Sequence, residues 1–297
     1  MERIINYSIQ EDHHGLTIQQ FLKLRLYTSK AIIALKKTPE GILLNGTWAY
    51  VNQKISSGDI LTVHIVETEI SEKIVPEHIP LDIVYEDDDI LVINKPADMP
   101  VHPSQNHYIG TLANALAYYF EKQHKPFVFR CINRLDKDTT GLTILAKHQL
   151  ASGILSDMVS KRLIKRTYLA LCIDNGALPS NGVIDVPIAR KEDSTIERCV
   201  DFEKGEYAVT HFTKIQHFSD KQISLIRLQL ETGRTHQIRV HMKYIGHPLI
   251  GDDLYESDCT LIRRQALHSY SLSFLHPVTL KEMYFEQELP KDMARLL

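Results

Sequence analysis

The first 68 residues change from helical to strand-like periodicity. Apolar residues recur at helical spacing over 18–26, and Thr17 stands before them as a candidate N-cap. The run 29–37 predicts a second short helix. Asn45-Gly46 lies between two short apolar runs, and because this pair tolerates positive φ it favours a tight hairpin turn. The pattern indicates a small unit of two helices and a few strands.

A segment rich in acidic residues separates this unit from the rest of the chain. The apolar run 60–65 predicts a closing strand. Residues 69–80 then contain two prolines and little apolar periodicity, which is typical of a linker. We therefore divide the chain into a small unit, residues 1–68, a linker, 69–80, and a larger domain, 81–297.

Strands and helices are interleaved irregularly in the larger domain. Short apolar runs at 83–85 and 90–93 flank an acidic turn, and an amphipathic helix is expected over 151–159. Further strands are expected at 165–171 and 223–230. Because several strands are joined by short turns, the pattern favours an α+β fold with a mixed, mainly antiparallel sheet and flanking helices.

Composition narrows the class of protein. The 297 residues are 43% apolar, which suits a globular core, and no run approaches the roughly 20 apolar residues of a membrane span. The start of the chain lacks the basic and then apolar layout of a signal peptide. The four cysteines have no paired spacing: Cys131, Cys172, Cys199 and Cys259. We therefore expect a cytoplasmic protein without disulfides, a zinc ribbon or a membrane partner.

The net charge of −3 counts mildly against a polyanionic partner, although a local basic groove stays compatible with it. No phosphate-binding glycine loop and no dinucleotide fingerprint occurs in the sequence. We therefore expect chemistry by side chains alone, with no cofactor. Nothing in the sequence requires more than a monomer.

The segment N-R-L-D-K-D-T-T-G, residues 133–141, concentrates polar groups directly before the apolar run 142–146. It contains two carboxylates, Asp136 and Asp138, together with two cations and two hydroxyls. Catalytic groups are often found in loops that a buried strand holds in place. A capped turn with a solvated ion pair explains the same residues, and their spacing alone does not choose between the two aspartates.

A second polar segment, G-R-T-H-Q-I-R-V-H, covers residues 233–241. A helix is expected from His236 to Tyr244, with Thr235 as its cap. Cations near a helix N-terminus oppose the macrodipole by about 0.3–1 kcal/mol each, so an anionic partner would explain them. A basic surface helix explains them equally well. Because His236 and His241 do not share a helix face, no metal site is expected.

A third candidate is Tyr168, which follows Lys165 and Arg166 in a predicted strand. A tyrosine in a strand usually packs in the core. Flanked by two cations, it could instead stack on a base whose backbone the cations hold.

Five motifs occur in the order found in the RluA-type RNA pseudouridine synthases, and the chain resembles that family over about residues 80 to 285. The motifs lie at 84–103, 133–147, 165–171, 232–252 and 266–277. The small first unit is similar to the αL RNA-binding domain that often precedes this catalytic domain. Three residues depart from the family pattern: Asn133 replaces histidine, Asp98 replaces glycine, and Thr140 replaces serine.

The resemblance implies conversion of uridine in RNA to pseudouridine, with Asp136 as the catalytic residue. It implies that Arg239 pairs with this aspartate and that Tyr168 stacks on the target base. Ile238 would line the pocket, and Arg134 would fill the space left by a flipped nucleotide. In the larger domain, the remaining expected RNA contacts are Arg234, Lys137 and Lys165. In the first unit, one helix face is expected to meet phosphates, and it carries Arg25, Lys30, Lys36 and Lys37.

The target RNA does not follow from the motifs. Large-subunit ribosomal RNA is our preferred target and transfer RNA the alternative. A non-catalytic RNA-binding factor in ribosome assembly would need only the first unit and basic patches. A carboxylate hydrolase would need a second acid across the pocket, and no motif supplies one.

Overall fold

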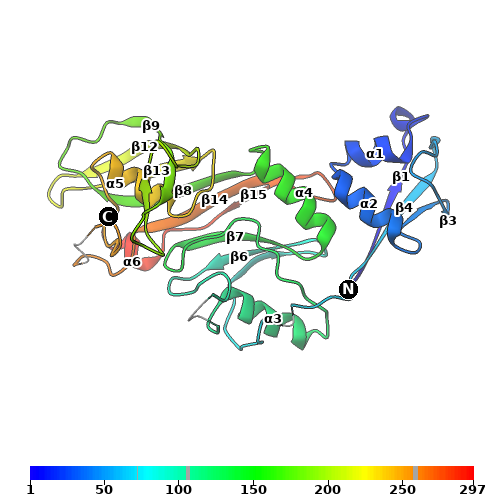
Figure 1. The fold of residues 1–297 in the computed structure, drawn as a ribbon, viewed down its shortest axis with the longest axis horizontal. Coiled ribbons are helices and arrows are strands. Elements are labelled where there is room, and N and C mark those ends of the chain that lie inside the picture. The colour runs from blue at the N-terminus through cyan, green and yellow to red at the C-terminus, as the bar shows by residue number, and fades with distance from the viewer. Residues whose placement is uncertain (72, 105–107, 257–259) are drawn as a thin grey trace.

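The computed structural model describes residues 1–297 except 72, 105–107 and 257–259, so Cys259 lies outside the described residues. Figure 1 shows a small N-terminal unit beside a long, twisted sheet that carries the other elements. The free cysteines of the described ranges are Cys131, Cys172 and Cys199. No helix in these ranges has the length and apolar character needed to cross a membrane.

The N-terminal unit is a four-stranded sheet, in the order β1-β4-β2-β3, with two helices packed on it. Thr17 caps the first helix in a capping box with Gln20, and the Asn45-Gly46 turn has positive φ at both residues, as the sequence predicted. The elements are β1 (Glu2–Ser8), the 3₁₀ helix η1 (Glu11–His13), α1 (Ile18–Leu24), α2 (Ser29–Lys37), β2 (Ile42–Leu44), β3 (Thr47–Trp48) and β4 (Ile60–Val66).

Apart from a separate two-stranded sheet of β10 and β11, the rest of the described chain is built on one large sheet, in the order β5-β6-β7-β14-β8-β13-β12-β9, with β15 paired to β14. Of the pairings found in it, β7 with β14 is parallel and the others are antiparallel, so the α+β prediction is confirmed. The elements are β5 (Ile83–Glu86), β6 (Ile90–Lys95), α3 (Leu112–Lys122), β7 (Thr140–Ala146), α4 (Gln149–Ser160), β8 (Lys165–Ile173), β9 (Asn181–Asp185), β10 (Ile188–Arg190), β11 (Arg198–Val200), β12 (Val209–Phe218), β13 (Ile223–Leu230), α5 (Gln237–Tyr244), β14 (Leu267–Leu275), β15 (Glu282–Glu286) and α6 (Lys291–Ala294).

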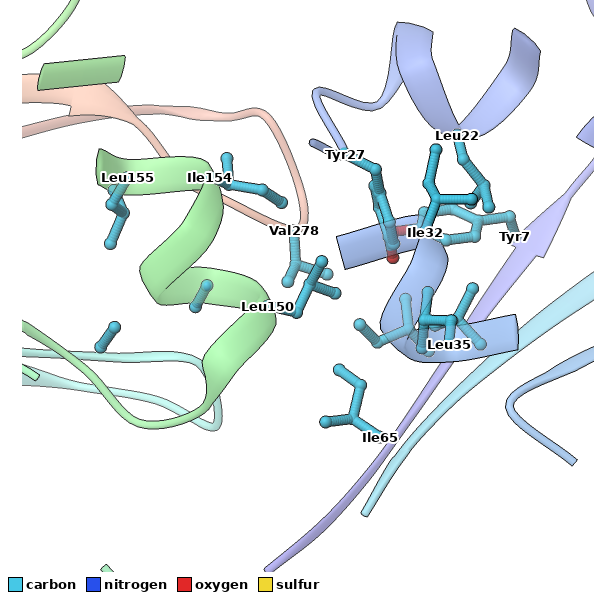
Figure 2. Close-up of a cluster of buried hydrophobic side chains, with 14 of the residues drawn as sticks. Tyr7, Leu22, Tyr27, Ile32, Leu35, Ile65, Leu150, Ile154, Leu155 and Val278 are labelled. Carbon is cyan, nitrogen blue, oxygen red and sulfur yellow. The ribbon is translucent and has the colours of Figure 1, made fainter. Parts of the chain in front are cut away.

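The N-terminal unit is docked on the large sheet through α4 and the turn between β14 and β15. Figure 2 shows Leu150 and Val278 facing Tyr27 and Leu35 within one buried apolar cluster. The Arg25 guanidinium donates a hydrogen bond to the Val278 carbonyl at 2.8 Å. Arg25 is therefore engaged in this interface, which the helical pattern did not predict, and its contact with RNA phosphates stays a prediction.

Two further charged contacts cross the same interface. Arg3 of β1 forms hydrogen bonds of 2.8 and 3.1 Å with the buried carboxylate of Asp89. Glu67, just after β4, pairs with Arg130 at 2.9 Å. Because these ion pairs flank an apolar contact, the interface resists both sliding and separation.

The start of β7 brings residues 134–139, the Asp136 loop, to the centre of the sheet. Gly141 has φ +104°, and a Cβ at this position would lie 2.3 Å from the carbonyl oxygen of Ser269 on β14. The two backbones can approach this closely because residue 141 has no side chain. Asn133 supports the other end of the loop: its amide donates to the Leu142 carbonyl and accepts from the Ile144 N–H.

We predict that Gly141→Ala lowers the free energy of unfolding by clearly more than the about 1–2 kcal/mol that left-handed backbone alone costs. The added Cβ overlaps backbone atoms of β14, so the strands must move apart. Gly46→Ala is the matched control, because Gly46 also has positive φ (+77°) but no atom within 4 Å of the new Cβ. Urea denaturation compares the two variants, and equal losses would refute the packing argument.

Candidate active site

The Asp136 carboxylate lies beside α5, where Arg239 joins it to a second carboxylate. Arg239 Nη1 donates to Asp136 Oδ2 at 3.3 Å, while Nε and Nη2 donate to Asp252 at 2.7 and 2.6 Å. Asp252 has no exposed side-chain area, whereas 27% of the Asp136 side chain is exposed. The bridge therefore has a buried end at Asp252 and an accessible end at Asp136.

The charge balance of this bridge keeps the guanidinium protonated. Burial alone would lower the pKa of Arg239, but hydrogen bonds and charges from Asp252, with the charge of Asp136, hold its pKa above the usual range. The guanidinium also lies over the Tyr255 ring, 5.0 Å from the centroid. A permanently charged, laterally packed arginine fixes the direction in which the Asp136 oxygens point.

His236 is the second charged or titratable neighbour of Asp136, after Arg239. Tyr255 accepts a hydrogen bond from the Arg198 N–H at 2.8 Å, so its hydroxyl proton is free to be donated to His236 Nδ1, 2.9 Å away. Burial lowers the pKa of His236, which favours the neutral ring with the proton on Nε2. That nitrogen lies 3.9 Å from Asp136 Oδ2.

The backbone at His236 is left-handed, with φ 56°, and this residue is the N-cap of α5 without a side-chain cap bond. The expectation that Thr235 caps this helix from its own position is therefore wrong, and α5 begins at Gln237. A non-glycine residue in this conformation stores about 1–3 kcal/mol of strain. In this conformation the His236 ring lies between Asp136 and Tyr255.

Tyr168 and Ile238 form an apolar wall near the carboxylate. Both are nearly buried and belong to one cluster with Leu135 of the Asp136 loop. Burial raises the pKa of Tyr168, so its phenol keeps its proton at neutral pH. The structure thus brings together a carboxylate, a cation, a neutral imidazole and an apolar surface.

Two basic side chains hold the Asp136 loop by donating hydrogen bonds to its backbone carbonyls. Lys95 is fully buried, and its ammonium donates to the carbonyls of Pro96, Met99 and Lys137 at 2.7–2.9 Å. Burial lowers the pKa of Lys95 to about 7, against the opposing charges of nearby aspartates. Arg264 donates to the Asp138 carbonyl at 3.0 Å. The side chains of Lys95 and Arg264 therefore fix two successive carbonyls of the loop, those of Lys137 and Asp138.

Asp98 links the segment that follows β6 to the Asp136 loop. Its φ is 57°, a conformation that glycine adopts freely, which accounts for the glycine usual at this position of the motif. Its N–H donates to Asp138 at 3.1 Å, and its carboxylate pairs with Lys137 at 2.7 Å. The departure from the motif thus adds an ion pair at the rim of the site.

The structure does not gather all the predicted residues. Asp136, Tyr168, Ile238 and Arg239 lie together around the site. The other predicted contacts lie on its rim or away from it: Arg134 and Lys137 are exposed on the loop, Arg234 pairs with Glu206, Lys165 is exposed at the start of β8, and Lys30 and Lys36 are exposed on α2.

Sequence reasoning missed Asp252 and Tyr255. Asp252 is the last residue of the motif at 232–252, and a buried arginine on α5 requires a carboxylate partner. That requirement could have singled it out. Tyr255 carries no comparable signal in the sequence.

One group of potential metal ligands is found among the described residues. It consists of Asp87, Asp89 and His276, at the end of β6 away from the Asp136 loop. His276 donates a hydrogen bond to Asp87 at 2.8 Å, and the Asp89 carboxylate accepts hydrogen bonds from Arg3 and His148. Because these oxygens already have protein donors, the group fits an internal ion-pair cluster, and it lies outside the candidate site.

Comparison with known proteins gives concordant matches. The family model described as RNA pseudouridylate synthase matches residues 89–244. The uncharacterized RNA pseudouridine synthase YjbO of Bacillus subtilis is 39% identical over 95% of this chain and 98% of its own length. Ribosomal large subunit pseudouridine synthase D of Vibrio vulnificus is 43% identical over 82% of this chain and 77% of its own. The structure of human RNA Pseudouridylate Synthase Domain Containing 1 has a TM-score of 0.58 at 27% identity, over 70% of this chain and 83% of that chain.

We predict that Asp252→Asn lowers the free energy of unfolding by about 3–5 kcal/mol, because it leaves Arg239 buried without its main partner. Asp136→Asn is the matched control: it removes the accessible end of the same bridge and should cost no more than about 1 kcal/mol. Denaturation at neutral pH measures both. A larger loss for the Asp136 variant would show that the bridge is anchored at the other end.

Proposed function

The chain belongs to the RNA pseudouridylate synthase family, and on that premise we propose that it converts uridines of large-subunit ribosomal RNA with Asp136 as the catalytic carboxylate. It is an isomerase that acts on RNA. In this reaction the base leaves its glycosidic nitrogen, turns over, and rejoins the ribose through carbon five. The observation that carries the proposal is the accessible Asp136 oxygen fixed by the buried Arg239 bridge.

Asp136 acts on the ribose side of the target nucleotide. Attack on the sugar and removal of a proton from it both require a carboxylate in a fixed direction, so the proposal includes both routes. Arg239 supplies that direction, and His236 is a neutral neighbour that adds no repelling or competing charge. We propose that these residues of one chain suffice for the reaction, without a second copy of the chain and without a cofactor.

The target base is taken out of its stack before the reaction. The glycosidic bond cannot be reached inside a helix, and flipping costs a few kcal/mol. Arg134 is exposed on the Asp136 loop, and we propose that it fills the vacated space. Tyr168 and Ile238 offer the flipped base an apolar surface.

Phosphates of the RNA are held by cations around the rim. Lys137 and Arg234 are paired with Asp98 and Glu206, whose side chains are 83% and 68% exposed. Exposed pairs are worth little, so a phosphate can displace them. Lys165 is exposed at the start of β8, and Lys30 and Lys36 are exposed on the N-terminal unit, residues 1–68. We assign this unit to RNA binding and propose that these three lysines contact phosphates farther from Asp136.

Large-subunit ribosomal RNA is the preferred target because relatives with that printed function cover most of this chain. Transfer RNA is the alternative substrate within the same reaction. A non-catalytic assembly factor would also bind RNA, but it would not need the Arg239 bridge or a strained His236 beside the carboxylate.

We predict that Asp136→Asn abolishes product while RNA affinity stays within about twofold, because the carboxylate is lost and the phosphate contacts remain. The assay is tritium release from RNA labelled at carbon five of uridine. Asp138→Asn removes the same charge two residues later and should retain measurable release, since that carboxylate faces the Asp98 N–H. Full activity of the Asp136 variant would eliminate the proposed mechanism.

Arg239→Lys is expected to lower turnover at least tenfold with little change in RNA affinity. Lysine keeps the charge near Asp252 but has no planar fork to reach both carboxylates. Single-turnover rates and filter binding, measured on the same RNA, separate the two effects. A loss of affinity with unchanged turnover would reassign Arg239 to phosphate binding.

A further inference from the structure

Arg166 is a cation beside the site that has no matching anion in the protein. Its Nε is buried and has no hydrogen-bond partner, and Nη2 makes only a long contact of 3.4 Å with the Thr232 carbonyl. Three other arginines around the site, Arg234, Arg239 and Arg264, each pair with a carboxylate. No ion pair of Arg166 is found within the part of the chain that the structure describes.

The strand places Arg166 on the same face as Tyr168. Side chains alternate along β8, and Tyr168 belongs to the cluster with Ile238, whereas Leu169 belongs to the cluster on the opposite face. Arg166, two residues before Tyr168, therefore points to the side of the sheet that carries the site. Its positive charge reaches the tyrosine, because it opposes the effect of burial on the Tyr168 pKa. By the same alternation, Lys165 points to the other face.

Gly233 leaves room for the guanidinium. A Cβ at this position would lie 3.1 Å from Arg166 Nη1 and 3.6 Å from Nη2. The side-chain-free backbone thus forms one wall of a slot for the planar group. The half-buried Arg166 guanidinium has lost part of its hydration. No carboxylate of the described chain compensates this loss.

We propose that Arg166 binds an anionic oxygen of the target nucleotide while Tyr168 contacts its base, an assignment that rests on the proposed function. The planar fork can give two parallel hydrogen bonds to such an oxygen group. Two parts of the nucleotide offer this chemistry: its phosphodiester, which is charged throughout the reaction, and the detached uracil, whose oxygens are charged only between bond breaking and bond making.

Kinetics separates these two sources. A phosphodiester contact is present in the ground state and the transition state alike, so its loss raises KM and leaves kcat unchanged. A contact with the detached base exists only during the reaction, so its loss lowers kcat and leaves RNA affinity unchanged.

The test is Arg166→Gln, assayed by tritium release and by RNA binding. We expect about a tenfold to hundredfold effect, in KM or in kcat, from the loss of a charge-assisted pair. The matched control is Arg227→Gln on β13. Arg227 is exposed and lies opposite Leu169 in the strand register, hence on the other face of the sheet. The Arg227→Gln change removes the same charge, and its KM and kcat should stay within about twofold of wild type.

Two variants keep the test informative if Arg166→Gln folds poorly. Arg166→Lys retains the charge and should recover only part of the loss, because it lacks the fork. Gly233→Ala narrows the slot and should shift the same kinetic parameter in the same direction by a smaller factor. Combined with Arg166→Gln it should add nothing further, since both changes act on one contact.

Effects of Arg166→Gln equal to those of Arg227→Gln, in both KM and kcat, would overturn the assignment, as would fully additive effects of the Arg166 and Gly233 changes. Failure of the proposed function would look different, because wild-type protein would then release no tritium. In that case the RNA affinities of the Arg166 and Arg227 variants still decide whether Arg166 binds an anionic oxygen, and equal affinities would refute it.

Discussion

The candidate site depends on one buried cation shared between two carboxylates. Arg239 can be buried because Asp252 neutralises it in the interior, and this frees Nη1 to fix the partly exposed Asp136. A buried arginine without Asp252 would be too costly, and an Asp136 without Arg239 would be free to rotate. The same guanidinium therefore serves stability through its buried bond to Asp252 and the proposed reaction through its bond to Asp136.

A second constraint acts on the backbone of the Asp136 loop. Lys95 and Arg264 donate to adjacent carbonyls, while the Asn133 amide joins the start of the loop to β7. Ordinary loops satisfy such carbonyls with water and stay mobile. This loop satisfies them with buried or partly buried side chains, so the position of Asp136 is set by the sheet beneath it. The proposed chemistry needs this rigidity, because a misplaced carboxylate loses the alignment on which the rate depends.

The sequence predicted the elements well where local periodicity decides the structure, as for α2 and for the buried strand after Gly141. It was wrong where a distant contact wins. Thr235 has the chemistry of a cap, but the contact of His236 with Tyr255 accompanies a left-handed turn one residue later. Arg25 has the pattern of a surface cation, yet its partner lies 253 residues away along the chain. Partners at such separations leave no trace in local spacing, and the pairing of Arg239 with Asp136 was expected only from the family resemblance.

The docking of the N-terminal unit on α4 has a geometric consequence. Two ion pairs and an apolar contact hold α2 at a constant separation from the Asp136 loop. If α2 binds phosphates and Asp136 receives the uridine, as proposed above, the RNA has to match a fixed distance between these two parts of the protein. The distance and curvature of the folded RNA would then contribute to the selection among its uridines.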